Sequence, residues 1–313
     1  MNNSLISIII PTYNRAQLIR KALHSIQNQT YTNWECLIVD DFSTDNTEII
    51  IEDLIKQDCR IKYLKNERTK GAQGARNTGI IHAQGDWIAF NDSDDEWVEN
   101  KLSKQIDVLY LNNFRYDIVV HGDCIVYNHL TNTEVELKLN KAEGESPFNL
   151  YLRGSFILFP AILTSKKALL QINLLDEKVP SYQEWDTVLQ LSQFCNFIHL
   201  QEALFIYHQH NYETISKDIS REIKGINFIR NKYRIDFIKH YSENEFLALI
   251  TINAHKAIRN KYWDLAKNTI KQVSDIMPLY KKILWWCILF FHINPSLILK
   301  LKIQLSNTFK KNK

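Results

Sequence analysis

Residues 85–95 read GDWIAFNDSDD, a stretch that joins a short apolar run directly to a cluster of carboxylates. Trp87 to Asn91 has the length and composition of a buried strand, and Asp92-Ser93-Asp94-Asp95 follows it at once. Upstream, short apolar runs alternate with helical periodicity: strands are expected at residues 6–10, 34–40 and 61–64, and helices at 17–28, 45–57 and 72–83. This alternation predicts an α/β fold with a mostly parallel central sheet that helices cover on both faces.

Polar residues follow three of these expected strands. Pro11-Thr12-Tyr13-Asn14 comes after the first strand, Asp40-Asp41 ends the second, and the acidic cluster follows the fourth. In an open parallel sheet, ligands bind beyond the carboxyl ends of the strands. We therefore expect the three groups to converge on one edge of the sheet and to form a binding site there.

The acidic cluster at residues 92–95 has two interpretations. Closely packed carboxylates repel one another, and a divalent cation such as Mg²⁺ or Mn²⁺, which prefers hard oxygen ligands, relieves that repulsion. Alternatively, the cluster is an acidic turn that caps a helix beginning near Glu96. Its position after a buried strand, level with Asp41, favours the metal site.

Two further segments in the first hundred residues are ambiguous when taken alone. Asp41 could accept hydrogen bonds from a ribose or a base, or could form an Asx-turn. Residues 71–79 match neither a Walker loop nor a GxGxxG fingerprint in spacing. Arg76 within them could bind phosphate or base, or could pair with a surface carboxylate.

Residues 183–186 and 207–210 carry the remaining candidates. Glu184 beside Trp185 could be a general base next to an aromatic platform for a sugar, or simply an acid favoured at a helix N-terminus. His208 and His210 flank an expected strand end, and only the acidic cluster supports a metal-binding role for either of them.

The composition narrows the class of protein. The chain has 313 residues, 45% hydrophobic and 23% charged, which is enough for one large α/β domain with an appended segment. A net charge of +3 argues against a nucleic-acid binder. The five widely spaced cysteines contain no CxxC, which argues against a disulfide framework or a zinc cluster. The N-terminus lacks the features of a signal peptide, so a cytoplasmic location is expected.

The C-terminal third differs from the rest of the chain. Strands are expected at 118–120, 134–139 and 204–207, and only helices after Ile219. Residues 283–291 read ILWWCILFF, too short a run for a membrane span, and no acidic residue follows Asp275 while seven lysines do. We expect the tail, residues 280–313, to lie on an anionic membrane surface; the alternative is a helix pair packed on the catalytic domain or on a partner subunit. The lack of a set of spans and of a Gln-x-x-Arg-Trp motif argues against a processive membrane polymerase.

Together the motifs resemble the family 2 inverting glycosyltransferases of the GT-A fold. The resemblance is carried by SIIIPTYNR at 7–15, QTY at 29–31 with WE at 34–35, VDDFSTD at 39–45, GARNTG at 74–79 and GDWIAFNDSDD at 85–95. It is specific to about residue 100, weaker over 180–216 and absent beyond. It implies a nucleotide-diphospho-sugar transferase fold over residues 1–216, with a nucleotide-binding half (1–100) and an acceptor half (101–216), followed by a helical C-terminal region (217–313).

The resemblance also implies roles for individual residues. The nucleotide-sugar site would comprise Pro11, Thr12, Tyr13, Asn14, Asp41, Arg76, Asn77, Asp92 and Ser93; the ligands of a Mn²⁺ or Mg²⁺ ion would be Asp92, Asp94 and His210; Glu184 would be the catalytic base and Trp185 would contact the acceptor. Gln183 stands where the family usually has an acid, and the family often has Asp in place of Glu184. Asp95 is expected to be structural.

The implied reaction is a single inverting transfer from a nucleotide-diphosphate sugar, expected to be a UDP sugar, to a hydroxyl of a glycan or polyprenyl-linked glycan. Such a step belongs to bacterial envelope polysaccharide (capsule or O-antigen) synthesis at the inner face of the cytoplasmic membrane. One alternative is a sugar-phosphate nucleotidyltransferase, but residues 11–14 lack the glycine-rich basic loop that it would need after the first strand. The other is a non-catalytic binding module with the same fold.

Overall fold

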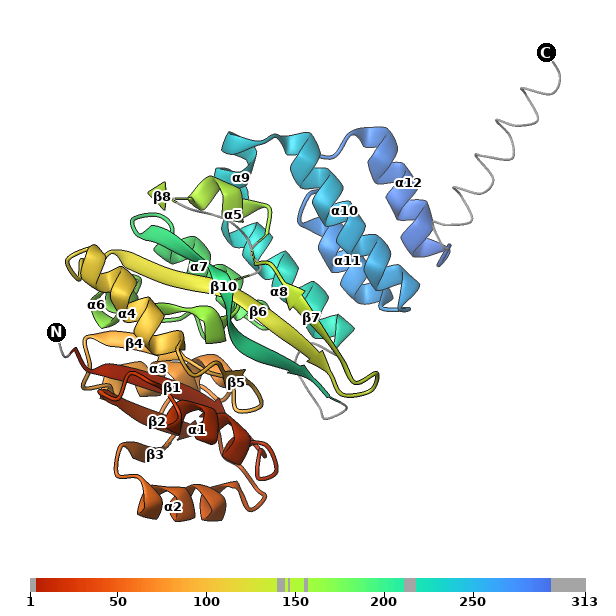
Figure 1. Ribbon diagram of the computed structural model, residues 1–313. Helices are drawn as coiled ribbons and strands as arrows, with labels where there is room; N and C mark the ends of the chain where they lie inside the picture. The colour runs from red at the N-terminus through yellow and green to blue at the C-terminus, as the bar shows by residue number, and fades with distance from the viewer. Residues whose placement is uncertain (1–3, 140–143, 146, 155–156, 211–217, 294–313) are drawn as a thin grey trace. The chain divides into compact units, whose positions relative to one another are not determined.

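The computed structural model describes residues 4–139, 144–145, 147–154, 157–210 and 218–293. The chain divides into two compact units, one of Met1–Lys178 with Gln183–Tyr212 and the other of Val179–Tyr182 with Glu213–Lys313. The first unit holds the sheet (Figure 1). In the second unit, the described residues form helices and no strands.

Among the described residues of the first unit, ten strands form one sheet in the order β3-β2-β1-β4-β9-β6-β10-β5, with β7 paired to β6 and β8 to β10. Its strands are β1 (Ile6–Thr12), β2 (Trp34–Asp40), β3 (Ile61–Lys65), β4 (Trp87–Phe90), β5 (Glu96–Trp97), β6 (Ile118–Asn128), β7 (Thr133–Leu137), β8 (Gly144–Glu145), β9 (Leu163–Ser165) and β10 (Asn196–Gln209). Along the main path all strands but β9 and β5 run in the same direction. The predicted mostly parallel α/β sheet is therefore confirmed.

Helices connect the strands and bury both faces of the sheet. They are α1 (Ile19–Gln27), α2 (Thr47–Gln57), α3 (Ala72–His82), α4 (Lys101–Leu111), α5 (Phe148–Leu152), α6 (Lys166–Gln171) and α7 (Gln183–Leu191), with a 3₁₀ turn at Phe159–Ala161. Ile8 and Ile10 of β1 share one core cluster with Leu23 of α1 and other residues of α1 and α2. Ile9 points to the opposite face, where a Cβ on Gly79 of α3 would lie 2.5 Å from its side chain. The missing side chain of Gly79 thus lets α3 pack directly onto β1.

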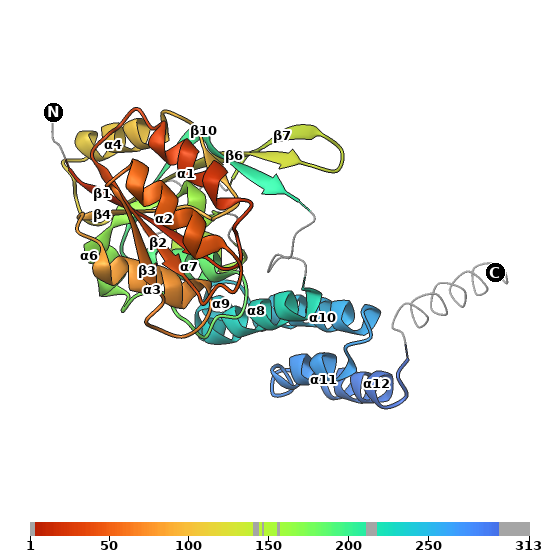
Figure 2. The same cartoon turned by 90° about the horizontal axis from the view of Figure 1, so that it is seen from below.

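Strands β6 and β10 are much longer than the sequence patterns suggest. They pair in parallel from Asn196 opposite Ile118 to Gln209 opposite Asn128, with two register shifts on the way. The first seven residues of β6 are buried, whereas β7, which pairs with the outer part of β6, is exposed throughout. Figure 2 shows β6 and β7 extending as a hairpin beyond the helices that cover the sheet.

The helices of the second unit, within its described residues, are α8 (Ile219–Lys232), α9 (Arg234–His240), α10 (Glu243–Arg259), α11 (Trp263–Lys271) and α12 (Leu279–Phe290). The four-residue segment 179–182 also belongs to it. Arg221 donates to the Pro180 carbonyl at 2.6 Å, and Tyr182 donates to Glu222 at 2.9 Å. The first unit is thus interrupted just before α7, whereas the expected domain runs without a break over residues 1–216. Among the described residues, no helix has the length and hydropathy needed to cross a bilayer.

Candidate active site

The ends of β1, β2 and β4 form one edge of the sheet. Thr12 lies opposite Asp40 in the parallel register, Asp41 donates its backbone N–H to the Thr12 carbonyl at 2.8 Å, and Asn91 donates to the Ile9 carbonyl at 3.1 Å. The polar groups that follow the three strands therefore lie at one edge, as the strand order requires. The buried hydroxyl of Thr12 has no hydrogen-bond partner among the described residues, as expected of a group that hydrogen-bonds to a bound ligand.

The loops after β1 and β2 are tied to each other. Asn14, which has a positive φ of 51°, donates its backbone N–H to the Ser43 hydroxyl at 2.9 Å. Its side-chain oxygen accepts from the Thr44 N–H at 2.8 Å. Tyr13 remains 43% exposed, with the Lys70 ammonium 5.1 Å from the centre of its ring. The residues expected to bind the nucleotide, Pro11 to Asn14, thus begin in β1 and end in a fixed loop at the sheet edge.

Asp41 organises the loop that follows β3. One of its carboxylate oxygens accepts from Asn66 Nδ2 at 2.7 Å, and the other accepts from the Gly71 N–H at 2.8 Å. A carboxylate has about four acceptor positions, so two remain for other donors. Asn66 was not among the expected site residues, although it directly follows the end of β3. The strand-end rule that selected Thr12, Asp41 and Asp92 would also have selected it.

Arg76 pairs with the acidic cluster and not with a surface carboxylate, so that alternative is wrong. Its guanidinium lies 2.7 Å from Asp92 Oδ1, and the side chain is buried. It also lies 4.1 Å from the centre of the Phe159 ring and donates to Gln183 at 3.4 Å. Arg76 therefore brings a buried positive charge between residues 92 and 183.

Asn77 is placed differently from the expectation that it binds the nucleotide. Its Nδ2 donates to the Leu175 carbonyl at 2.9 Å and to Glu177 at 2.7 Å, and its Oδ1 accepts from the Leu175 N–H at 2.9 Å. These protein contacts use the polar atoms of the side chain. Asn77 consequently ties α3 to the segment that follows α6.

The acidic cluster is not a helix cap, so that alternative interpretation is wrong. Glu96 and Trp97 form β5, which pairs with β10, and α4 begins only at Lys101. Asp95 is buried, and one of its oxygens accepts from the backbone N–H of His208 at 3.0 Å. Asp95 thus anchors the turn to β10. Ser93 is buried in the same turn.

Asp94 and His210 face each other across the site. His210 Nε2 lies 3.0 Å from Asp94 Oδ2, and the guanidinium of Arg15 lies 3.7 Å from the same oxygen. Burial raises the pKa of Asp92, with the Arg76 charge opposing this shift and the Asp94 charge adding to it. Burial and the neighbouring carboxylates raise the pKa of Asp95 well above its ordinary value. The carboxylates therefore repel one another, as the sequence predicts, and positive charge stabilises their ionised forms.

The donor set fits a divalent metal that also binds a substrate. Among the described residues, no three His, Cys, Asp or Glu side chains converge into a complete metal site. Asp94 and His210 nevertheless supply a carboxylate and an imidazole side by side, and Asp92 adds a second carboxylate two residues before Asp94. A metal that carries a nucleotide commonly keeps one or two protein ligands and completes its shell with phosphate oxygens and water.

Glu184 lies in the first turn of α7 and is partly exposed. Burial raises the pKa of its carboxyl, the charge of Arg76 opposes this shift, and the charge of Asp92 adds to it. Glu184 directly follows Gln183, to which Arg76 donates at 3.4 Å, so the Arg76–Asp92 pair lies beside the start of α7. Trp185 is only 4% exposed, and its indole N–H donates to the Tyr151 carbonyl at 2.7 Å. Because this ring is enclosed in the interior, the expectation that it stacks on the acceptor does not match the structure.

Residues 7–169 match the family described as Glycosyl transferase family 2. The chain belongs to this family. The family is one of glycosyl transferases, not of nucleotidyltransferases.

Curated relatives of this chain are named as glycosyltransferases or glucosyltransferases. The chain is 47% identical to UDP-Glc:alpha-D-GlcNAc-diphosphoundecaprenol beta-1,3-glucosyltransferase WfgD of Escherichia coli, over 41% of this chain and 49% of the relative. It is 43% identical to the putative teichuronic acid biosynthesis glycosyltransferase TuaG of Bacillus subtilis, over 34% of this chain and 42% of the relative. The chain thus spans about half the length of these relatives. An uncharacterized glycosyltransferase of Haemophilus influenzae is 28% identical over 95% of this chain and 99% of its own length.

Solved structures confirm the GT-A fold. TarS 1–349 of S. aureus in complex with UDP-GlcNAc has a TM-score of 0.61 at 19% identity, over 86% of this chain and 81% of TarS. The mannosyltransferase PcManGT of Pyrobaculum calidifontis, in complex with GDP-Man and Mn²⁺, has a TM-score of 0.57 at 15% identity, over 89% of this chain and 77% of that protein. At these identities the likeness concerns the fold alone.

Proposed function

We propose that this glycosyltransferase moves a sugar from a UDP sugar to a hydroxyl of a lipid-linked glycan, with inversion at the anomeric carbon, during envelope polysaccharide assembly. The observation that carries the proposal is the grouping of Arg76–Asp92 and Asp94–His210 at the carboxyl edge of the sheet, where Arg76 also donates to Gln183, the neighbour of Glu184 in the chain. The name of WfgD supports the donor and the lipid-linked acceptor, and that of TuaG supports a biosynthetic role.

Each group has a separate task in the proposed reaction. Glu184 accepts the proton of the acceptor hydroxyl while that oxygen forms a bond to the anomeric carbon and the bond to the diphosphate breaks. Arg76 balances the charge of Asp92 beside the departing diphosphate. A divalent cation held by Asp94, His210 and Asp92 would supply positive charge to the diphosphate when bound.

The test is Glu184→Gln, assayed with a panel of nucleotide sugars and an undecaprenyl-diphosphate-linked sugar, with Mn²⁺ or with EDTA. We expect UDP binding to stay within about twofold of wild type and turnover to fall by about 10²- to 10⁴-fold, the range that a general base contributes. The control is Glu202→Gln, which removes an exposed carboxylate paired with Lys104 in the same unit. Full transfer by Glu184→Gln would contradict the assignment of the base. Binding without any turnover in the wild type would favour the non-catalytic module.

We also propose that α12 holds the protein on an anionic membrane surface, which would place it peripherally at the inner face of the cytoplasmic membrane. One face of α12 packs inside the second unit through Trp285 and Ile288, which are 5% and 3% exposed. The exposed apolar residues of this segment, at 44–72%, are Leu279, Tyr280, Ile283, Leu284, Trp286, Phe290 and Phe291. Trp286 stacks on Phe290 with ring centres 4.9 Å apart, which makes a compact aromatic patch.

Charge argues for a lipid surface as the occupant of this patch. Lys281 and Lys282 lie in the same helix, and the sequence has no acidic residue after Asp275. Aromatic side chains lie at the headgroup level of a bilayer, and basic residues are attracted to anionic lipid. The rest of the basic tail, residues 294–313, lies outside the described residues.

Flotation with phosphatidylglycerol vesicles and with phosphatidylcholine vesicles tests this second proposal. The double variant Trp286→Ser/Phe290→Ser should lose binding to the anionic vesicles. The control, Ile235→Ser/Ile252→Ser, changes two exposed apolar residues of the same unit and should bind like wild type. Equal flotation of both variants, or none by the wild type, would favour a protein partner for α12.

A further inference from the structure

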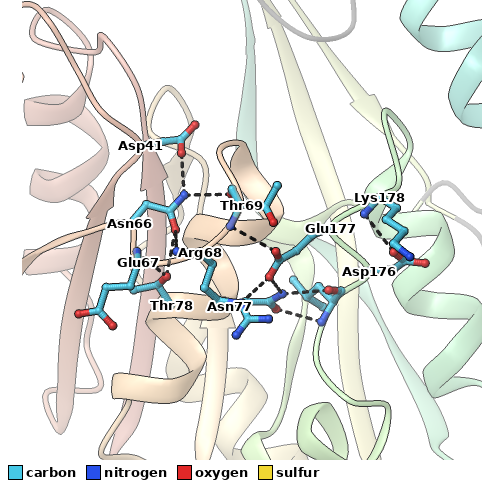
Figure 3. Close-up of polar contacts among 11 residues, drawn as sticks. Asp41, Asn66, Glu67, Arg68, Thr69, Asn77, Thr78, Asp176, Glu177 and Lys178 are labelled. Atoms are coloured by element: carbon cyan, nitrogen blue, oxygen red, sulfur yellow. Dashed lines mark hydrogen bonds and ion pairs between the residues drawn. The ribbon is translucent and has the colours of Figure 1, made fainter.

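Residues 66–71 form a loop that joins β3 to α3 and encloses Asp41. Asp41 accepts from Asn66 Nδ2 at 2.7 Å at one end of the loop (Figure 3). At the other end it accepts from the Gly71 N–H at 2.8 Å. Asn66 Nδ2 also donates to the Thr69 carbonyl at 3.1 Å, across the loop. The shape of the loop and the orientation of the Asp41 carboxylate are therefore fixed together.

Helix α3 supports the second side of this loop. The Thr78 hydroxyl donates to Asn66 Oδ1 at 3.0 Å and accepts from the Glu67 N–H at 3.2 Å. A Cβ on Gly74 would lie only 1.8 Å from the Thr69 carbonyl oxygen. Because that oxygen belongs to the backbone, only glycine allows so close an approach of the helix to the loop.

Glu177, about a hundred residues later in the chain, closes the third side. Its carboxylate accepts from Arg68 Nε, from the Thr69 N–H at 3.4 Å and from Asn77 Nδ2 at 2.7 Å (Figure 3). Burial alone would raise the pKa of Glu177, but these hydrogen bonds and the charge of Arg68 outweigh it and lower the pKa to about 2. The side chain is 15% exposed. Two of its three partners, Arg68 and Thr69, belong to the loop itself.

We propose that Glu177 is a positioning residue for donor binding: it anchors the 66–71 loop, and through that loop it fixes the Asp41 carboxylate at the nucleotide edge of the sheet. This inference rests on the proposed function, with Asp41 in the nucleotide-binding role that the family resemblance implies. Without Glu177 the loop loses its anchor to the acceptor half of the unit. Ordering the loop then becomes a cost of binding the nucleotide, and affinity falls.

The experiment is Glu177→Gln, which keeps the size of the side chain but removes its charge. The readouts are the Kd for UDP by calorimetry in MnCl₂, and KM and kcat with the UDP sugar that the donor panel selects. We expect Kd and KM to rise about tenfold, the effect of weakening hydrogen bonds to one charged group, with kcat within about twofold. The control is Asp117→Asn, which removes another arginine-paired carboxylate, bonded by Arg115 at 3.0 and 2.6 Å and placed before β6 at the opposite sheet edge. It should leave Kd unchanged.

An unchanged Kd in Glu177→Gln overturns the inference, whatever happens to Tm, and so does a fall in kcat alone. If this variant does not fold, Arg68→Gln removes one partner of the carboxylate from a side chain that is 39% exposed. It should raise Kd a few-fold, and an unchanged Kd again overturns the inference. A wild type that turns over no nucleotide sugar contradicts the proposed function as well. If the wild type binds UDP and transfers sugar, but neither Glu177→Gln nor Arg68→Gln raises the Kd, only the positioning role is contradicted.

Discussion

Replacing Arg76 by methionine tests the centre of the site most directly. The substitution keeps most of the apolar stem but removes the guanidinium from the face of Phe159 and from Asp92. The acidic turn then retains its carboxylates without their buried positive partner.

The expected cost follows from burial. Removing one partner of a fully buried ion pair costs about 3–5 kcal/mol. The Asp92 side chain is 33% exposed, however, so water screens the carboxylate left behind, and this contribution falls to about 2 kcal/mol. Losing the guanidinium over Phe159 adds about 1 kcal/mol. Arg76→Met should therefore lower the free energy of unfolding by about 3 kcal/mol.

Urea unfolding followed by tryptophan fluorescence measures this change, provided that the m value is conserved. The matched control is Arg60→Met. Arg60 also pairs with an aspartate (Asp58, at 2.8 Å) and lies 3.6 Å from the centre of the Trp34 ring, but it is 33% exposed. It should cost about 1 kcal/mol and leave UDP binding unchanged. A loss below about 0.5 kcal/mol for Arg76→Met, or an equal loss for both variants, would refute the reasoning.

Three further outcomes are expected. Mn²⁺ should raise Tm of the wild type but not of Asp94→Asn, because a metal stabilises the folded state that binds it; a shift retained in the variant, measured by scanning calorimetry, would rule out Asp94 as a ligand. The acidic limb of the kcat/KM profile should lie above the ordinary Glu pKa of 4.5, because burial raises the pKa of Glu184 and activity is lost as pH falls through that pKa. Arg76→Met removes a charge that lowers the pKa of Glu184, so this variant should move the limb to still higher pH. A pH–rate profile in which the limb does not move speaks against Glu184 as the base. Lys101 is fully buried, with its ammonium 4.0 Å from the centre of the Trp97 ring, and burial holds its pKa well below 10.5. Between the lowered pKa of folded Lys101 and the ordinary value of 10.5, the unfolded chain binds more protons than the folded one, so the free energy of unfolding should rise with pH in that range. Lys101→Met should flatten this rise, measured by urea unfolding at several pH values. An unchanged pH dependence in the variant would show that other groups cause the rise.

The sequence anticipated the parts of the site that follow from short-range pattern. Thr12 ends β1, and Asp41 and Asp92 follow the ends of β2 and β4, so these residues must lie at the carboxyl edge of a parallel sheet. The repulsion among the carboxylates of residues 92–95 follows from their spacing alone. The sequence could not decide whether Arg76 binds a ligand or pairs with a surface carboxylate, because its partner depends on how α3 lies against the acidic turn.

The failures have a common cause in long-range packing. Trp185 looked like a platform for a sugar, but Tyr151 provides its hydrogen-bond acceptor and the interior encloses it. Asn77 lies in a segment typical of the family, yet its amide is used by Leu175 and Glu177. The expected strand at 204–207 is only part of β10, because pairing with β6 continues the strand beyond the residues whose local pattern predicts it.

The sequence by itself determined the α/β fold, the edge of the sheet that carries the site, and the residue types gathered there, because strand period and strand-end position are local properties. The tertiary structure alone decided which of those residues meet. The pairing of Asp94 with His210 spans 116 positions and that of Arg76 with Gln183 spans 107. The anchoring of the 66–71 loop by Glu177 likewise depends on β-sheet order and on the close approach that Gly74 permits. No local pattern encodes such contacts, since they form only when the whole sheet brings distant strands and helices together.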